Sequence, residues 1–238
     1  MEHVRHGRAE CVFAREEELR GERWDPAYWH PRHAALAGSC SLPCAPLGSF
    51  VEHITYGPIL PGRRPEPVAE GVAVIGQKAV RATGVLLDKA VTVAEGCAFD
   101  LPRCRLRPGD IVLCRSGVGA LGRRRFTVFD EPVAATVSCF VDLIRLCGIS
   151  PYYVVTFLRS RLGWAQVERQ INGLGTPNVS FAELCALAVP CLPQAEQAEV
   201  EAAWAGVREA HAAGEFEAAE GRLDAIVGRL DERLLSAP

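Results

Sequence analysis

The chain has 238 residues, of which 49% are hydrophobic and 23% are charged. This composition is typical of a globular protein with a substantial apolar core. No run of about 18 apolar residues exists, which excludes a membrane-spanning helix, and residues 1–24 lack the apolar stretch of a secretory signal. We therefore expect a cytoplasmic protein without a membrane partner.

The net charge of −3 conceals an asymmetry along the chain. Residues 56–125 carry 12 lysines and arginines against 6 acidic residues, whereas residues 195–238 carry 4 against 10. This distribution indicates a basic surface beside an acidic C-terminal segment.

The ten cysteines show no CxxC spacing, and several lie in apolar runs, as Cys114 and Cys139 do. We interpret them as reduced thiols, mostly buried in the core. The six histidines have no metal-ligand spacing, so neither a metal nor a cofactor is expected.

The predicted elements fall into an N-terminal β-rich part and a C-terminal helical part. Residues 1–23 are predicted to be frayed or a short helix, and the proline-rich stretch 24–50 to hold at most one short helix, near residues 33–37. Short strands are predicted from apolar runs bounded by glycine and proline at residues 71–76, 84–88, 109–117 and 125–129, and one buried strand running into a turn at residues 132–146.

Helical spacing begins after Ser150, which is a plausible N-cap with Pro151 at the first helical position, and continues to residue 164. Ser180 and Glu183 have the spacing of a capping box. A terminal strand is predicted at residues 188–193, followed by a helix pair, or one long helix broken near Gly214.

A glycine-rich turn separates two of the predicted strands. Gly117, Gly119 and Gly122 match the dinucleotide fingerprint GxGxxG, but the fingerprint requires a following helix, and β-type residues follow here. The same turn is flanked by Arg115 and Ser116 and by Arg123, Arg124 and Arg125. Glycine allows close backbone approach to a phosphate, and guanidinium groups neutralise its charge. The alternative is a solvated hairpin whose arginines point into water.

No catalytic constellation is present: there is no GxSxG elbow, no Walker loop and no Pro-Pro sequence of the kind that marks amino-methyltransferases. We therefore expect a protein that is not an enzyme. Two alternatives stay open, a protein-interaction module and a small enzyme that holds a nucleotide on the glycine loop.

Several short motifs between Trp24 and Gln197 resemble, in order and spacing, the target-recognition domain of specificity (S) subunits of type I restriction–modification systems. The motifs are Arg23–Tyr28, Pro46–Gly48, Val74–Val80 with Gly84, Leu106–Leu113, Arg115–Gly117, Gly122–Arg123, Tyr152–Tyr153 with Leu158 and Ser160, Gly175–Ser180, and Val189–Gln194 with Gln197. The segment Arg222–Val227 is similar to the tail that follows this domain in fused restriction–methylation enzymes.

The resemblance implies an α+β fold: a twisted, β-rich target-recognition domain with a few helices, followed by a C-terminal long helix or helix pair. It implies an N-terminal extension at residues 1–23, the recognition domain at 24–193 and spacer or docking helices at 194–238. A full S subunit carries two such domains, and this chain carries one, a half-subunit form. The resemblance also implies that the domain recognises double-stranded DNA for a partner adenine methyltransferase, with a restriction or helicase subunit as a further partner. The alternative is a non-DNA-binding interaction module or a methyltransferase regulator.

Two sets of residues follow as site predictions. The DNA-binding set comprises Lys78, Arg115, Ser116, Arg123, Arg124, Arg125, Thr176 and Asn178, with Arg63 and Arg64 as further candidates. For Thr176 and Asn178, a turn that caps the next helix is an equally good interpretation. The partner-binding set is an apolar stripe, by which two copies could also form a dimer: Trp204, Phe216, Leu223, Ile226, Leu230 and Leu234.

Overall fold

The computed structural model describes residues 2–6, 9–13, 28–30, 40–171 and 176–235. The short helix predicted near residues 33–37 lies outside them. At the N-terminus, β1 (Glu2–His6) and β2 (Ala9–Phe13) pair as an antiparallel hairpin. The prediction that residues 1–23 are frayed or form a short helix is therefore wrong for these ten positions, which include the strand-favouring residues Val4, Val12 and Phe13.

The main sheet has four antiparallel strands in the order β4-β10-β7-β8. Its inner strand β7 is buried along its whole length, as the apolar run there requires. The strands are β4 (Val51–Tyr56), β7 (Ile111–Cys114), β8 (Phe126–Val128) and β10 (Val141–Leu146).

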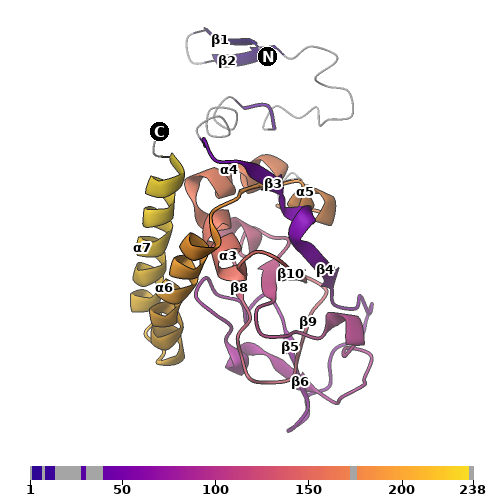
Figure 1. Cartoon of the computed structure of the whole chain (residues 1–238). Coiled ribbons are helices and arrows are strands. Elements are labelled where there is room, and N and C mark those ends of the chain that lie inside the picture. The colour runs from indigo at the N-terminus through magenta and orange to yellow at the C-terminus, as the bar shows by residue number, and fades with distance from the viewer. Residues whose placement is uncertain (1, 7–8, 14–27, 31–39, 172–175, 236–238) are drawn as a thin grey trace.

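A second sheet of three strands has the order β6-β5-β9, with β5 and β9 parallel, and lies at the end of the molecule away from the long helices (Figure 1). Two short strands, β3 and β11, pair separately. These strands are β3 (Cys44–Pro46), β5 (Val72–Ile75), β6 (Val91–Val93), β9 (Ala135–Val137) and β11 (Ala188–Pro190).

Two predicted strands differ from the structure. Residues 84–88 form only a β-bridge at Val85 and the start of a 3-10 helix (Leu87–Lys89). The run 132–146 is two strands in different sheets, because a turn at residues 138–140 redirects the chain between β9 and β10. An apolar run buried at both ends gives no periodicity signal for such a turn. The predicted strands at 71–76, 109–117 and 125–129 are confirmed as β5, β7 and β8.

The helices begin where their capping residues predict. Ser150 accepts a hydrogen bond from the Tyr153 backbone N–H, and Ser180 and Glu183 form the capping box. The single helix predicted after Ser150 is broken at Ser160, whose side chain caps a second helix by accepting from the Gly163 N–H. The three helices are α3 (Pro151–Arg159), α4 (Arg161–Gln170) and α5 (Phe181–Cys185).

The C-terminal helices α6 (Gln194–Ala212) and α7 (Phe216–Leu235) lie side by side along α3 (Figure 1). Gly214, with φ of 77°, makes the turn between them, as predicted. The Trp204 indole N–H donates to the Thr156 hydroxyl at 2.9 Å, and the Tyr152 hydroxyl, Arg208 and Asp130 form a polar cluster beside it. These contacts hold α6 against α3, so the helix pair packs on the rest of the fold.

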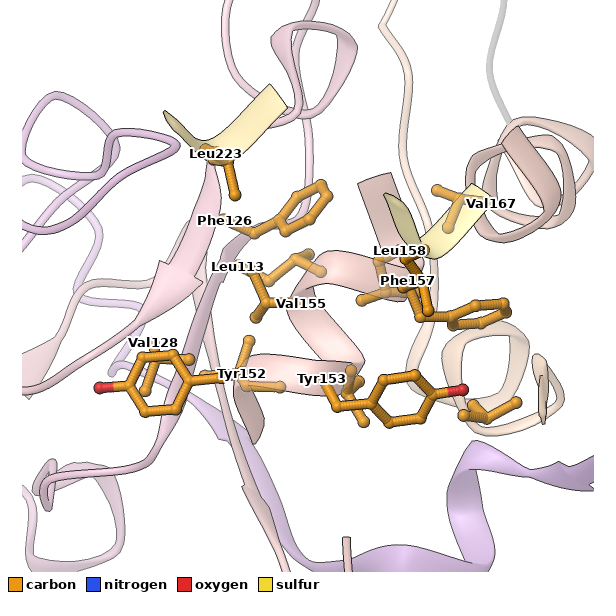
Figure 2. Close-up of a cluster of buried hydrophobic side chains, with 14 of the residues drawn as sticks. Leu113, Phe126, Val128, Tyr152, Tyr153, Val155, Phe157, Leu158, Val167 and Leu223 are labelled. Carbon is orange, nitrogen blue, oxygen red and sulfur yellow. The ribbon is translucent and has the colours of Figure 1, made fainter. Parts of the chain in front are cut away.

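One hydrophobic cluster joins the main sheet to five helices, and Figure 2 shows part of it, with side chains from β7, β8, α3, α4 and α7. Both α3 and the inner faces of α6 and α7 contribute to it. The predicted α+β class with a C-terminal helix pair is confirmed. None of the helices among the described residues is long and apolar enough to cross a membrane.

The described cysteines are unpaired, but their predicted burial is largely wrong. Only Cys104 and Cys114 are fully buried, while Cys44, Cys147 and Cys191 are exposed. The apolar neighbours of an exposed cysteine lie on the other face of its strand or in a turn, so a sequence run overestimates burial.

A buried carboxylate lies at the centre of the main sheet. The Asp142 side chain on β10 is 0% exposed, and neither of its oxygens accepts a hydrogen bond from a protein group. The guanidinium of Arg115 lies 3.6 Å from one of these oxygens. Burial raises the pKa of Asp142 from the ordinary 3.8 to about 7, and Arg115 only partly opposes this.

Replacing Trp204 by Ala tests the attachment of α6. The side chain is 1% exposed, and its loss leaves a large cavity and removes the hydrogen bond that the Thr156 hydroxyl accepts, so we expect a cost of about 3–5 kcal/mol in the free energy of unfolding. Urea unfolding measures it, with Glu199→Ala on the exposed face of α6 as the control. A loss as small as that of the control would show that α6 is not part of the core.

Replacing Asp142 by Asn tests the buried carboxylate. Because its folded pKa is about 7 and its ordinary value is 3.8, the folded chain holds this proton more tightly than the unfolded chain, and stability falls as pH rises from about 4 to about 7. A pKa difference of one corresponds to about 1.4 kcal/mol. We therefore expect Asp142→Asn to gain stability relative to wild type as pH rises through this window, measured by urea unfolding at a series of pH values. Parallel pH profiles for the two proteins would contradict the assignment.

Candidate nucleic-acid interface

The hairpin of β7 and β8 carries the glycine-rich turn and its arginines. Gly117 has φ of 96°, which favours glycine, and a 3-10 turn (Leu121–Arg123) follows. The next element is β8, so no α-helix begins after Gly122 to present N–H groups to a pyrophosphate. The prediction that a strand and not a helix follows the glycine-rich turn is confirmed by this geometry.

Gln77, which the site prediction omitted, connects three segments around this turn. Its side-chain amide donates to the carbonyl oxygens of Ser116 at 2.9 Å and Phe140 at 3.4 Å. Its own backbone carbonyl accepts from Arg125 at 3.1 Å. Gln77 therefore holds the loop after β5, both ends of the hairpin turn and the turn before β10 in one surface. Its position directly after a strand and a glycine was the only sequence signal.

The segment Thr176–Ser180 joins the same surface. Ser116 and Asn178 form a β-bridge, the Gly117 N–H donates to the Pro177 carbonyl at 2.9 Å, and the Val179 N–H donates to the Arg115 carbonyl at 3.3 Å. The structure thus brings the predicted contacts Ser116 and Asn178 together although they lie far apart in the chain. Thr176 is exposed at the edge of this segment.

The four joined segments, residues 76–79, 115–125, 138–141 and 176–180, contain no acidic residue. They carry five cations, among which Lys78 and Arg123 are exposed and Arg125 is half-buried on the Gln77 carbonyl. We call this set of segments the basic surface. Two carboxylates adjoin these segments: Asp142 lies beside Arg115, and Glu183 accepts a hydrogen bond from the Ser180 N–H. The exposed cations favour a polyanionic ligand.

Arg115 and Arg124 are engaged in the fold. The guanidinium of Arg115 stacks over the Tyr56 ring at 4.4 Å and lies beside Asp142, so only one part of it faces the basic surface. Arg124 has the left-handed φ of 52°, which turns its side chain to the helices, where it lies 4.4 Å from the centre of the Trp164 ring. Burial lowers the pKa of Arg124. The prediction that Arg124 acts with Arg123 and Arg125 is therefore not supported by its orientation.

Arg159, at the end of α3, contacts the β7–β8 hairpin through hydrogen bonds and an aromatic ring. Its guanidinium donates to the backbone carbonyls of Arg124 at 2.9 Å and Phe126 at 2.5 Å, and lies over the Phe126 ring. Burial lowers its pKa to about 9. This side chain binds the start of β8 to α3 and so positions the arginine hairpin. Nothing in its sequence context marked it.

The candidates Arg63 and Arg64 lie apart from the basic surface. They line a separate hollow of about 480 Å³ beside Val68 and Phe99, near the edge strand β6. No hydrogen bond connects this hollow to Gln77 or to the hairpin among the described residues.

The predicted partner-binding stripe packs inside the chain. Five of its side chains are at most 3% exposed and belong to the main hydrophobic cluster, and the sixth, Phe216, is half-buried beneath Arg81 at 4.3 Å. An amphipathic helix buries its apolar face wherever a matching face exists, and here α3 supplies it. The prediction that these residues form a docking surface or a dimer contact is corrected accordingly: Phe216 packs against Arg81 and His211, and the core of the chain contains the other five, Trp204, Leu223, Ile226, Leu230 and Leu234.

Within the described part of the chain, no cluster of three or more histidines, cysteines and carboxylates is arranged to hold a metal ion. The basic surface can bind an anion and offer hydrogen bonds, and its described side chains form no nucleophile–base pair.

No family model and no curated protein matches the sequence. Solved structures match its fold. A chain of a type I R-M system, solved to explain complex assembly and conformational transition of that system, has a TM-score of 0.51 at 16% identity, covering 87% of this chain and 50% of that chain. The type IIG restriction endonuclease BpuSI has a TM-score of 0.52 at 7% identity, covering 84% and 33%. The HsdS subunit from Thermoanaerobacter tengcongensis has a TM-score of 0.47 at 16% identity, covering 88% and 51%.

At these identities the likeness concerns the fold, and this chain spans about half the length of the matched R-M chain. The fold implied by the sequence resemblance is confirmed: the chain is folded like part of a type I restriction–modification protein and like part of a type IIG restriction endonuclease.

Proposed function

We propose that the chain is a non-catalytic target-recognition protein of a restriction–modification system that binds double-stranded DNA in a sequence-specific manner. The observation that carries the proposal is the basic surface, in which Gln77 joins three segments and the Ser116–Asn178 bridge joins the fourth. Three of its cations, Lys78, Arg123 and Arg125, are not turned into the core of the fold. The likeness of fold to a type I R-M chain supports it.

Within this surface the side chains divide by chemistry. Lys78 and Arg123, which are exposed cations, suit phosphate contacts that position the domain on the duplex. Ser116 and Asn178, paired across the β-bridge, offer a hydroxyl and an amide that suit base edges. Arg125 donates a hydrogen bond to the Gln77 carbonyl.

We propose further that the chain acts as a half subunit for a partner adenine methyltransferase, with a restriction or helicase subunit as a second partner. The support is that this chain matches about half of the R-M chain. Since the apolar stripe is buried, a partner would contact the outward faces of α6 and α7, which carry most of the 10 acidic residues between positions 195 and 238.

Replacing Arg123 and Arg125 together by Ala tests the DNA-binding proposal. A random-sequence duplex pool and a duplex selected from it by the wild-type chain serve as ligands. We expect weaker binding and a shallower plot of log affinity against log salt, with the slope reduced by about 0.9 for each phosphate that the variant no longer neutralises. Fluorescence anisotropy at several salt concentrations measures both.

The control is Arg229→Ala, because Arg229 is exposed on α7 beside α6, away from the hairpin. An unchanged affinity and slope for the double variant would exclude the hairpin from the DNA contact. Capture of a methyltransferase by a wild-type chain that binds no duplex would favour the alternative function, an interaction module or methyltransferase regulator.

A further inference from the structure

Phe140 is a large aromatic residue in one of the segments of the basic surface, and it is 57% exposed. It lies in the turn between β9 and β10, whose neighbouring residues Val137 and Val141 are both fully buried. Exposing an aromatic ring forgoes the burial that stabilises such side chains in a core. The side chain is therefore available for contact with a ligand.

The turn that carries the ring is held by backbone hydrogen bonds along its length. The Ser138 N–H donates to the Ile75 carbonyl at 3.0 Å, and the Val141 N–H donates to the Ser138 carbonyl at 3.1 Å. The Phe140 carbonyl accepts from the Gln77 amide and from the Arg115 N–H, both at 3.4 Å. The ring thus projects from a fixed backbone, which reduces the entropy lost when it binds.

The surroundings of Phe140 favour a polyanionic ligand with apolar faces. Its hydrogen-bonded neighbours Gln77 and Arg115 belong to the segments that contain cations and no carboxylate. Val118, at the tip of the glycine-rich turn, is a second exposed apolar side chain in these segments, at 63%. Duplex DNA combines the two properties, because its phosphates are charged and a base step exposes apolar π faces where it is unstacked.

We propose that Phe140 is an apolar wedge that enters a base step of the bound duplex and locally unstacks it. The proposal rests on the proposed DNA-binding function. Insertion of an apolar side chain kinks a duplex and makes binding depend on how easily a given step unstacks. Phe140 would then select sequence by deformability, in addition to any hydrogen bonds from Ser116 and Asn178.

The experiment compares wild type with Phe140→Ala on a duplex that the wild-type chain has selected from a random-sequence pool. 2-Aminopurine replaces each adenine in turn, and permanganate tests each thymine, so that unstacking at A·T pairs is detected on both strands. Wild type is expected to raise fluorescence or reactivity at one step, and Phe140→Ala to abolish that signal. The affinity should fall about tenfold, as expected when one base–aromatic stack is removed.

Two control variants complete the design. Val133→Ala removes an exposed apolar side chain at the opposite end of β9 and should retain the unstacking signal, whereas Phe140→Trp should restore it. The salt slope of Phe140→Ala should equal that of wild type, because the ring neutralises no phosphate. Since the ring is exposed, the urea midpoint should not change.

Each outcome either supports or overturns the proposed role of Phe140. Loss of the signal in Phe140→Ala with a conserved salt slope supports the wedge. Wild-type binding without any unstacked base, or equal unstacking by Phe140→Ala, overturns the wedge and leaves the proposed function intact. A wild-type chain that binds no duplex overturns both, and an exposed ring that instead contacts a protein partner would give this result.

Discussion

The proposed interface depends on the side-chain amide of Gln77. This amide donates to two carbonyl oxygens, on Ser116 and Phe140, which belong to turns that follow different strands. Without it the Ser116 carbonyl would have to find water and the Phe140 carbonyl would keep only the Arg115 N–H, so the loops would lose a fixed spacing. One neutral group thus fixes the relative positions of the hairpin, the Phe140 turn and the Lys78 loop without adding charge to the surface.

The sequence predicts the local elements well where a single residue type has a specific geometric role. Ser150, Pro151 and the Ser180–Glu183 pair mark their helix starts correctly, and Gly214 marks the turn between the last two helices. Features that depend on contacts between distant segments are harder to predict from the sequence. The run 132–146 is apolar on both sides of the turn, so periodicity could not divide it between two sheets.

The three arginines that begin at Arg123 show that the orientation of site residues is equally hard to predict from the sequence. Three consecutive arginines suggest one charged cluster, but the positive φ of Arg124 sends its side chain to Trp164, away from its neighbours. Backbone dihedral angles at a tight turn are decided by the packing beneath it, in this case by Arg159 on the hairpin carbonyls. Gln77 was not predicted for a related reason. Its side chain donates hydrogen bonds to carbonyl oxygens of distant segments, and no local sequence pattern indicates that role.

The C-terminal helices show why an amphipathic stripe does not identify its partner. A stripe from Phe216 to Leu234 requires an apolar surface to cover it, and spacing alone cannot say whether that surface belongs to this chain or to another. Here α3 covers it, and the Trp204–Thr156 hydrogen bond fixes the match. By the same physical criterion, an apolar side chain that the fold leaves uncovered is the better indicator of a ligand. Among the described residues of the basic surface that criterion selects Phe140 and Val118, whose backbones are held by hydrogen-bonded turns while their side chains face outward.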